Sequence, residues 1–400
     1  MNKPTAETNY RALYGKLFSA LTRQFGIHHF TEIEDAIQNS FLISVKNWKA
    51  DNTPKSKEDW LFVTTKNDLL NQLKRNSKLS ALEANHTTSY SELNTTDLRL
   101  ETILLVASSN TISKQAKIVF VLKNIFGLSI QEIAESTLLG NEAIYKIIGR
   151  SKNSLQNEFK DRLISEIIET VGDDEILIVE EILYAVFNSG FDSFSEKHQS
   201  IINEDLCLES FALAKILLND FNRESTSNLL SLFCFHIARI EAKVSAGKLI
   251  SFFNQDRNNW NNELINLGFH YLKKPDKINK FYIEALIVSK YMSTLSFTTD
   301  FWNDIIKLYE ILLQLSPSPI IEMNYCFCLH KAQRKEEAIN LLEKIESNLP
   351  SEHIYLSLIK ASFLGETNPA ASERITANII TKMNQDIRKK YLLETRFINL

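Results

Sequence analysis

Glycine and proline are scarce in this chain of 400 residues, which contains only ten glycines and seven prolines. These two residues interrupt regular backbone, so their scarcity permits long uninterrupted elements. Leucine, isoleucine, lysine, glutamate and asparagine are common, and 44% of the residues are hydrophobic, which is ample for burial. This composition predicts an all-α protein.

The length and the charge distribution suggest more than one domain. A chain of 400 residues exceeds one ordinary hydrophobic core, so two or three domains are expected. Residues 1–160 hold 20 Lys and Arg against 16 Asp and Glu, whereas residues 161–400 hold 25 against 33. A mildly basic front and an acidic rear suit a nucleic-acid-binding part joined to a protein-binding part.

Residues 127–155 read as two short helices around a tight turn. Ser129 is a predicted N-cap, with Glu132 completing a capping box. Gly140 lies in the turn and tolerates positive φ. The apolar face is expected at Ile133, Ala134 and Leu138 in the first helix, and at Ile144, Ile147, Ile148 and Leu155 in the second. The pattern is typical of a helix-turn-helix, although it also describes any helical hairpin.

One face of the second helix is polar and is not expected to pack in the core. Its residues are Asn141, Glu142, Tyr145, Lys146, Gly149, Arg150 and Asn153. A helix-turn-helix places such a face in the DNA major groove, where the first turns read bases and the rest contacts phosphates.

Two helices are predicted near the N-terminus. Residues 10–25 carry an apolar stripe of Leu13, Leu17, Phe18, Leu21 and Phe25. A second helix begins at Thr31 as N-cap, with a core stripe of Ile33, Ile37, Phe41 and Val45. Its outer face carries Glu34, Asp35 and Gln38, which are either a solvated face or a docking surface for a partner helix.

Residues 58–78 combine aromatic and basic side chains at helical spacing. Trp60 comes early, and Lys66, Asn67, Asn71, Lys74 and Arg75 follow along one side. Aromatic and basic side chains together can stack unpaired bases and hold phosphates, unless the aromatics belong to the core.

The next segment is rich in Ser, Thr and Asn and is predicted to be a flexible linker over residues 79–97. Helices are expected at 98–107 and 113–126.

The front of the chain resembles an extracytoplasmic-function sigma factor of bacterial RNA polymerase. The run Glu34-Asp35-Ala36-Ile37-Gln38-Asn39-Ser40-Phe41 is similar to the motif of the second sigma region that grips the polymerase β′ subunit. The resemblance implies that Glu34, Asp35 and Gln38 bind core polymerase, whose β and β′ subunits are the expected protein partners.

Two further motifs occur in the family's order. Trp60-Leu61 through Lys66-Asn67 to Lys74-Arg75 is similar to the stretch that opens and reads the −10 element. Leu128-Ser129 through Glu132-Ile133-Ala134 to Arg150-Ser151-Lys152 is similar to the fourth region, which reads the −35 element. The resemblance implies −10 contacts by Trp60, Lys66, Asn67, Asn71, Lys74 and Arg75, and −35 contacts by Asn141, Glu142, Tyr145, Lys146, Arg150 and Lys152.

The rear of the chain resembles the helical-repeat extension of one subgroup of these factors. Similar runs include Glu181-Ile182-Leu183-Tyr184, Asp205-Leu206-Cys207-Leu208-Glu209 and Gln255-Asp256-Arg257 with Trp260. Ala332, Ala338, Tyr309 and Tyr325 are similar to packing positions of tetratricopeptide repeats. The expected domains are therefore region 2 at 8–78, region 4 at 98–160 and an α-solenoid-like domain at 174–400, which would bind a protein or peptide.

No catalytic chemistry is predicted. The chain lacks a glycine-rich phosphate loop, a G-x-S-x-G or H-E-x-x-H motif and a paired C-x-x-C, so neither an enzyme, a cofactor nor a metal is expected. The cysteines at 207, 234, 326 and 328 are expected to be buried free thiols. Asp256 and Arg257 are expected to form an internal ion pair between repeats rather than a catalytic cluster.

The predicted function is a cytoplasmic sigma factor that directs promoter-specific transcription initiation, with a rear domain that regulates it. No apolar run approaches the roughly 20 residues that span a bilayer, so no membrane association is expected. The alternative is a helix-turn-helix transcription regulator or scaffold with tetratricopeptide-like repeats that never joins polymerase.

Overall fold

The computed structural model confirms the all-α class. It describes residues 6–48, 53–75, 97–137, 139–160, 162–192, 201–348, 354–383 and 385–395. Within these segments the only strands are β1 (Val244–Ser245) and β2 (Lys248–Leu249), an antiparallel pair in which Val244 lies opposite Leu249. None of the helices in these segments combines the length and the apolar character needed to span a bilayer.

The chain divides into two compact units. The first comprises Met1–Ser193 with Glu204–Leu213, and the second comprises Phe194–Asn203 with Ala214–Leu400. The boundary therefore falls inside α11 (Glu204–Phe221), whose first ten residues belong to the first unit. The predicted linker lies almost wholly at residues 76–96, outside the described residues.

The first unit consists of helices from the front of the chain. They are α1 (Ala6–Phe25), η1 (Ile27–His29), α2 (Phe30–Asn47), α3 (Lys57–Arg75), α5 (Leu98–Ala107), α6 (Lys114–Asn124), α7 (Ile130–Thr137), α8 (Asn141–Glu158), α9 (Ile164–Glu169) and α10 (Asp173–Phe191). The predicted stripe of α1 is buried in full, and Phe18 and Leu21 have no exposed surface.

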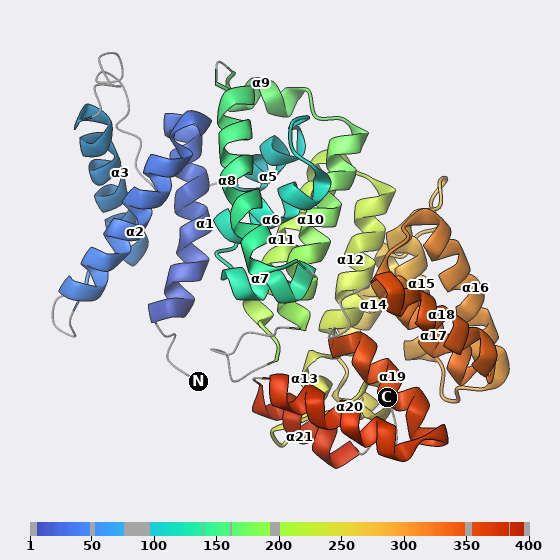
Figure 1. Cartoon of the computed structure of the whole chain (residues 1–400). Coiled ribbons are helices and arrows are strands. Elements are labelled where there is room, and N and C mark those ends of the chain that lie inside the picture. Colours follow the sequence, from blue (N-terminus) through green and yellow to red (C-terminus); the bar gives the residue numbers. More distant parts are fainter. Residues whose placement is uncertain are drawn as a thin grey trace. The chain divides into compact units, whose positions relative to one another are not determined.

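Packing in the first unit joins elements that are far apart in sequence (Figure 1). We call residues 6–75 the front half and residues 97–160 the helix-turn-helix half. In the front half α2 packs against α1 and α3, and in the helix-turn-helix half α8 packs against α6 and α7. The two halves also pack together, because α1 contacts α5 and α6. α10 contacts α5, α6 and α7, so it completes this core.

Two details of α2 correct the sequence-based expectation. The helix begins at Phe30 and its N-cap residue is His29, which makes no side-chain capping bond, so Thr31 is not the cap. Val45 is 71% exposed rather than part of the core stripe, whereas Ile33 and Ile37 are fully buried. The helix therefore faces the core with its first half and presents apolar surface near its end.

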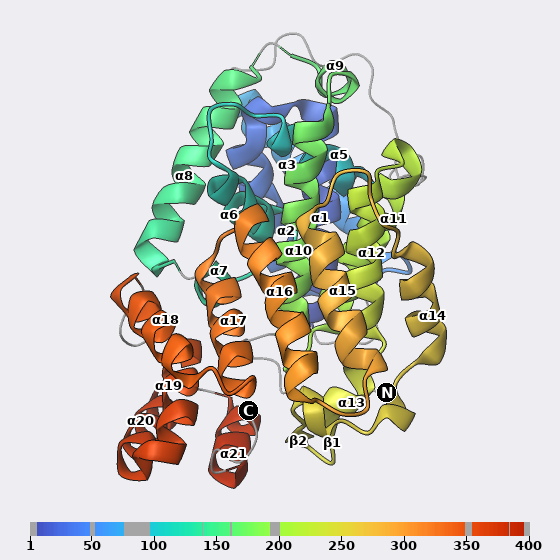
Figure 2. The same cartoon turned by 90° about the vertical axis from the view of Figure 1, so that its right-hand side faces the viewer.

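The second unit is a succession of helices that follow one another in space. They are α12 (Glu224–Ile237), α13 (Ile240–Lys243), η2 (Phe252–Asn254), η3 (Arg257–Asn259), α14 (Asn262–Tyr271), α15 (Lys280–Ser293), α16 (Thr299–Leu315), α17 (Pro319–Lys331), α18 (Lys335–Asn348), α19 (Ile354–Thr367), α20 (Pro369–Lys382) and α21 (Asp386–Thr395). Helices α15, α16 and α17 run side by side (Figure 2), α18 packs on α17, and α19 packs on α20. Packing in chain order is the arrangement of stacked helical repeats.

Small and aromatic residues fill the interior of the second unit. Ala332 and Ala338, predicted as small packing positions, are 5% and 0% exposed, and Tyr309 lies in the same apolar cluster. All four cysteines are buried and free, as predicted. Burial raises the pKa of the Cys326 and Cys328 thiols to about 12, so both are protonated at neutral pH.

The segment around Arg257 is structural, but not through the predicted ion pair. Asp256 is the N-cap of η3 and accepts from the backbone N–H of Asn258. Arg257 instead donates to the carbonyl oxygens of Met292 and Thr294 at the end of α15, and its guanidinium lies 5.0 Å from the ring centroid of Trp260. Arg257 therefore anchors η3 to the C-terminus of α15.

Candidate nucleic-acid interface

The predicted capping box at the start of α7 is present. The Ser129 hydroxyl accepts from the Glu132 backbone N–H at 3.2 Å, and the Glu132 carboxylate accepts from the Ser129 backbone N–H at 2.8 Å. Two backbone donors that the helix cannot satisfy internally are thus satisfied. This bond pair fixes where the first helix of the helix-turn-helix begins.

The turn before α8 does not use the positive φ that glycine permits. Gly140 is the N-cap residue of α8, with an extended conformation and φ of −74°, so no positive φ is needed there. The left-handed residue is Gly127, with φ of +64°, in the bend between α6 and α7. Leu138, expected on the buried face, lies outside the described residues.

The polar face of α8 points outward. The helix is anchored by the buried side chains of Ile144, Ser151 and Leu155. The first turns and the middle of the helix expose Asn141, Glu142, Tyr145, Lys146 and Arg150. Within the described part of the chain, none of these five side chains makes a hydrogen bond or ion pair with another residue. Five of the six predicted −35 residues are therefore available to a ligand.

Lys152, the sixth of these residues, has a different environment. Its ammonium forms an ion pair with the carboxylate of Glu34 on α2, and each side chain is 15% exposed. Burial lowers the pKa of Lys152 below its usual value. The structure thus brings a predicted DNA-binding residue and a predicted polymerase-binding residue together.

The C-terminal end of α8 is held by an acidic side chain. The Glu158 carboxylate accepts from the Asn110 backbone N–H at 2.8 Å and from the Thr111 hydroxyl at 2.6 Å, and it also bonds the Ser109 hydroxyl. Burial would raise the pKa of Glu158, but these hydrogen bonds lower it below its usual value. Glu158 therefore fastens α8 to the loop between α5 and α6.

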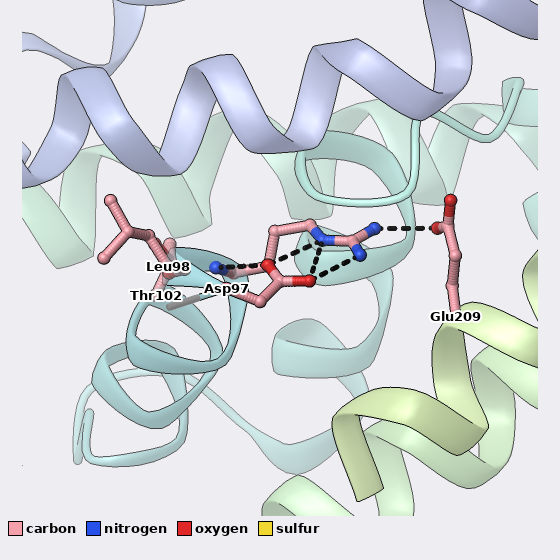
Figure 3. Close-up of polar contacts among 5 residues, drawn as sticks. Asp97, Leu98, Thr102 and Glu209 are labelled. Atoms are coloured by element: carbon pink, nitrogen blue, oxygen red, sulfur yellow. Dashed lines mark hydrogen bonds and ion pairs between the residues drawn. The ribbon is translucent and has the colours of Figure 1, made fainter. Parts of the chain in front are cut away.

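A buried arginine joins α5 to α11. Arg99 is 4% exposed and donates to Asp97 at 2.7 Å and to Glu209 at 2.7 Å, and the two carboxylates approach from opposite sides (Figure 3). Burial would lower the pKa of Arg99, but the two acidic partners raise it. Asp97 also caps α5 by accepting from the Arg99 backbone N–H. This cluster holds the helix-turn-helix half against the first part of the rear segment.

The predicted −10 face lies along α3. Asn67, Asn71, Lys74 and Arg75 are exposed, and Lys66 is half-buried, which lowers its pKa. Trp60 is also half-buried and packs edge-on against Trp48, with ring centroids 5.3 Å apart. The Asp68 carboxylate already accepts hydrogen bonds from the side-chain amides of Asn39 and Gln72. The helix thus presents polar and basic groups next to a partly accessible indole.

The outer face of α2 is larger than the sequence reading indicated. Asp35 and Gln38 are exposed as predicted. Leu42 and Val45 extend the same stripe at i+7 and i+10 from Asp35, and they are 59% and 71% exposed. We call these four residues the α2 stripe. The sequence did not reveal this stripe because Val45 was expected in the core. The spacing of Leu42 and Val45, one helical turn apart, nevertheless places both on the same face.

The other residues that shape the site could not be identified from the sequence. Arg11 pairs with Glu132, and Arg99 pairs with Glu209 in addition to nearby Asp97, so each arginine has a partner more than a hundred residues away. Among the described residues, no group of three or more His, Cys, Asp or Glu side chains is arranged to hold a metal ion.

Comparisons with known proteins give a family match for only part of the chain. Residues 176–275 match a family described as "Family of unknown function (DUF6596)". The chain is similar to the uncharacterized protein R00370 of Rhizobium meliloti (strain 1021), with 23% identity over 357 residues that cover 85% of this chain and 83% of that protein. No solved structure matches the chain significantly. The family match begins in α10 and so includes residues of both units.

Proposed function

We propose that this chain is a sigma subunit, which binds core RNA polymerase and directs it to promoters in the bacterial cytoplasm. The proposal rests on the exposure of the predicted contact residues of the three motifs. None of these contact residues is buried, and most lie on exposed faces of α2, α3 and α8. The three faces are therefore accessible to a polymerase surface and to DNA.

The α2 stripe supports the protein-binding part of the proposal. Leu42 and Val45 lie one turn apart on the same face of α2 as two exposed polar side chains. The combination is typical of a protein interface, where an apolar centre is bordered by polar residues. Leu42 and Val45 would supply that centre, and Asp35 and Gln38 would supply directional hydrogen bonds.

The face of α8 supports the duplex-binding part. Asn141 and Glu142 lie in the first turn, where recognition helices contact base edges, and Lys146 and Arg150 follow at phosphate-contacting positions. An asparagine amide can bond adenine bidentately, and a glutamate can accept from the cytosine amino group. Tyr145 is 64% exposed and would add apolar contact in the groove.

The α3 face supports recognition of separated strands. Lys74 and Arg75 would hold phosphates, and Asn67 and Asn71 would bond exposed base edges. Extruding a base costs a few kcal/mol, which stacking on an aromatic side chain such as Trp60 offsets. The second unit would bind a protein or peptide that regulates these activities.

Binding and transcription assays with core polymerase test the proposal. The purified chain should co-purify with core polymerase and produce transcripts with a defined 5′ end from its own promoter. Binding to upstream DNA without binding to polymerase would favour the helix-turn-helix regulator instead. Mapping transcripts after overexpression of the chain supplies the promoter for the assay.

A further inference from the structure

A short basic segment interrupts the acidic rear of the chain. Residues 161–400 carry 25 Lys and Arg against 33 Asp and Glu, but residues 273–280, which lead from α14 into α15, hold four lysines and one aspartate. Lys273, Lys274 and Lys277 are exposed. Within the described part of the chain their ammonium groups make no hydrogen bond or ion pair, so three positive charges are available to a ligand.

Buried polar side chains of α12 hold the start of this segment. The Ser227 hydroxyl donates to the Tyr271 carbonyl at 2.8 Å, and the Asn228 side chain accepts from the Lys273 backbone N–H at 3.3 Å. Ser227 and Asn228 are 8% and 0% exposed. These bonds use only the backbone of the segment, so the lysine side chain keeps its own donors for another partner.

The remainder of the segment is fixed in the same way. The Glu224 carboxylate at the start of α12 accepts from the Asp276 backbone N–H at 3.0 Å, and Pro275 is buried. Asn279 is the N-cap of α15 and accepts from the Tyr282 backbone N–H at 3.0 Å. A ligand therefore meets lysines on a backbone that is already ordered, which lowers the entropy cost of binding.

Two exposed aromatic rings directly precede the lysines. Phe269 is 46% exposed, and His270 beside it is also exposed. The Phe269 ring touches α12 only by an edge-on contact with Phe235, at 5.0 Å between ring centroids. Gly268 lets α14 approach α12 this closely, because a Cβ atom there would lie 2.6 Å from a carbon of the Phe235 ring. Phe269 thus combines a fixed position with an accessible surface.

Cations next to accessible aromatic rings suit single-stranded nucleic acid. Lysines neutralise the phosphates of the strand, and an aromatic ring stacks on an unpaired base. A run of acidic side chains could also pair with the lysines, but it has no flat partner for an aromatic ring. Every base has such a face, so the combination favours a nucleic acid over an acidic protein.

We propose that residues 269–277, which we call the basic segment, are a binding site for single-stranded nucleic acid on the second unit. Lys273, Lys274 and Lys277 contact phosphates, and Phe269 stacks on an unpaired base. The site shares no residue with the predicted −10 and −35 faces, which belong to the first unit. Binding at the basic segment does not require the chain to join polymerase.

Oligonucleotide binding by the full chain tests this proposal. The affinity for a labelled single strand is measured by fluorescence anisotropy over a range of salt concentrations. The segment variant replaces three lysines by glutamine: Lys273→Gln, Lys274→Gln and Lys277→Gln. The control variant removes the same charge from exposed lysines elsewhere in the second unit: Lys307→Gln, Lys335→Gln and Lys344→Gln.

The segment variant should lower the salt slope by about two units, because each phosphate contact on a single strand contributes about 0.7. The control variant should keep the wild-type slope. Phe269→Ala should weaken binding about tenfold at every salt concentration and leave the slope unchanged, whereas Phe269→Tyr retains a ring and should bind as the wild type does. A duplex of the same sequence has no unpaired base and should bind Phe269→Ala as well as the wild type.

A photocrosslinker shows where the strand lies. Benzoylphenylalanine in place of Phe269 should crosslink to the bound oligonucleotide on irradiation. The same group in place of Leu295, which is 89% exposed between α15 and α16, should not. Thermal melting of each variant checks that the second unit remains folded.

Three results would overturn the proposal. The first is a wild-type salt slope for the segment variant. The second is an equal decrease in the segment and control variants, which would mean that only net charge matters. The third is loss of polyglutamate binding by the segment variant with oligonucleotide binding unchanged, which would favour an acidic protein partner. None of these results bears on the sigma function, which the polymerase assay tests separately.

Discussion

At the scale of single residues, the buried Arg99 links the helix-turn-helix half to α11. It is 5% exposed as a side chain, while its partners Asp97 and Glu209 are 23% and 24% exposed. Removing one member of such a cluster leaves charges without partners, which costs more than the pair itself contributes. The cluster thus makes the start of α5 sensitive to a change in α11.

Arg99→Ala should therefore lower the free energy of unfolding by about 3 kcal/mol. Arg150→Ala is the matched control, because Arg150 is exposed and has no partner among the described residues, and it should change stability by no more than about 0.5 kcal/mol. Urea denaturation of both variants provides the comparison. Equal stabilities would show that the buried cluster contributes nothing.

Arg150 also carries a prediction about DNA. Loss of a single phosphate contact weakens binding to all sequences and reduces the salt slope by about one unit. Titrating promoter duplex with Arg150→Ala over a range of salt concentrations should show that decrease, whereas Asn141→Ala should relax base preference and leave the slope unchanged. A wild-type slope for Arg150→Ala would place the duplex elsewhere.

At the scale of elements, hydrogen-bonded carboxylates hold α5, α7 and α8 in place. For Asp97, Glu132 and Glu158, burial would raise the pKa, but the partners lower it below the usual value in each case. A carboxyl group with a lower pKa in the folded chain stabilises the fold above its unfolded pKa of about 4, and this contribution is lost as the pH falls below that value.

Stability of the first unit should consequently fall as the pH drops below about 4, and by more in the wild type than in Glu158→Gln. The amide side chain of that variant cannot titrate, so the substitution removes the contribution of one carboxylate from the pH dependence. Urea midpoints measured at several acidic pH values give both slopes. Parallel slopes would mean that the Glu158 bonds to Ser109 and Thr111 do not form in solution.

The α2 stripe gives a second prediction at this scale. Replacing Leu42 and Val45 together by aspartate should abolish capture of core polymerase, while leaving stability within about 0.5 kcal/mol, because both side chains are exposed. Leu163→Asp is the control, since Leu163 is 65% exposed at another surface. Undiminished capture by the α2 double variant would remove this surface from the interface.

Local structure was predictable from the sequence where it depended on periodicity and on capping. The Ser129–Glu132 box and the stripe of α1 are found as expected, since both depend on residues within a few turns. Thr31 and Val45 were misassigned because the position of a helix in the core depends on neighbours that its own pattern does not reveal. The Arg11–Glu132 pair needs tertiary packing and has no local signal.

At the scale of the whole molecule, the residues that follow position 160 are not a single domain that could be removed without affecting the first unit. α10 packs on α5, α6 and α7, and residues 204–213 of α11 belong to the first unit. The core of the helix-turn-helix half is therefore completed by residues that follow the predicted domain boundary. A test of regulation by the rear domain must keep these residues in place.

Two truncations distinguish a structural role from a regulatory role. A chain that ends at residue 165 should show reduced stability of the first unit, because it lacks α10, whose Ile176, Val179 and Ile182 are almost fully buried. A chain that ends at residue 221, after α11, should keep that stability and lose only regulation by the second unit. Circular dichroism melts and transcription assays of both chains check this, and equal melting behaviour would contradict it.

Transcription by a reconstituted polymerase tests the central claim most directly. Core polymerase, this chain and a template carrying its mapped upstream region should yield one transcript with a unique 5′ end, and no such transcript should form without the chain. A stable polymerase complex that never starts at that position, or the same transcript from core polymerase alone, would contradict the assignment as a sigma subunit.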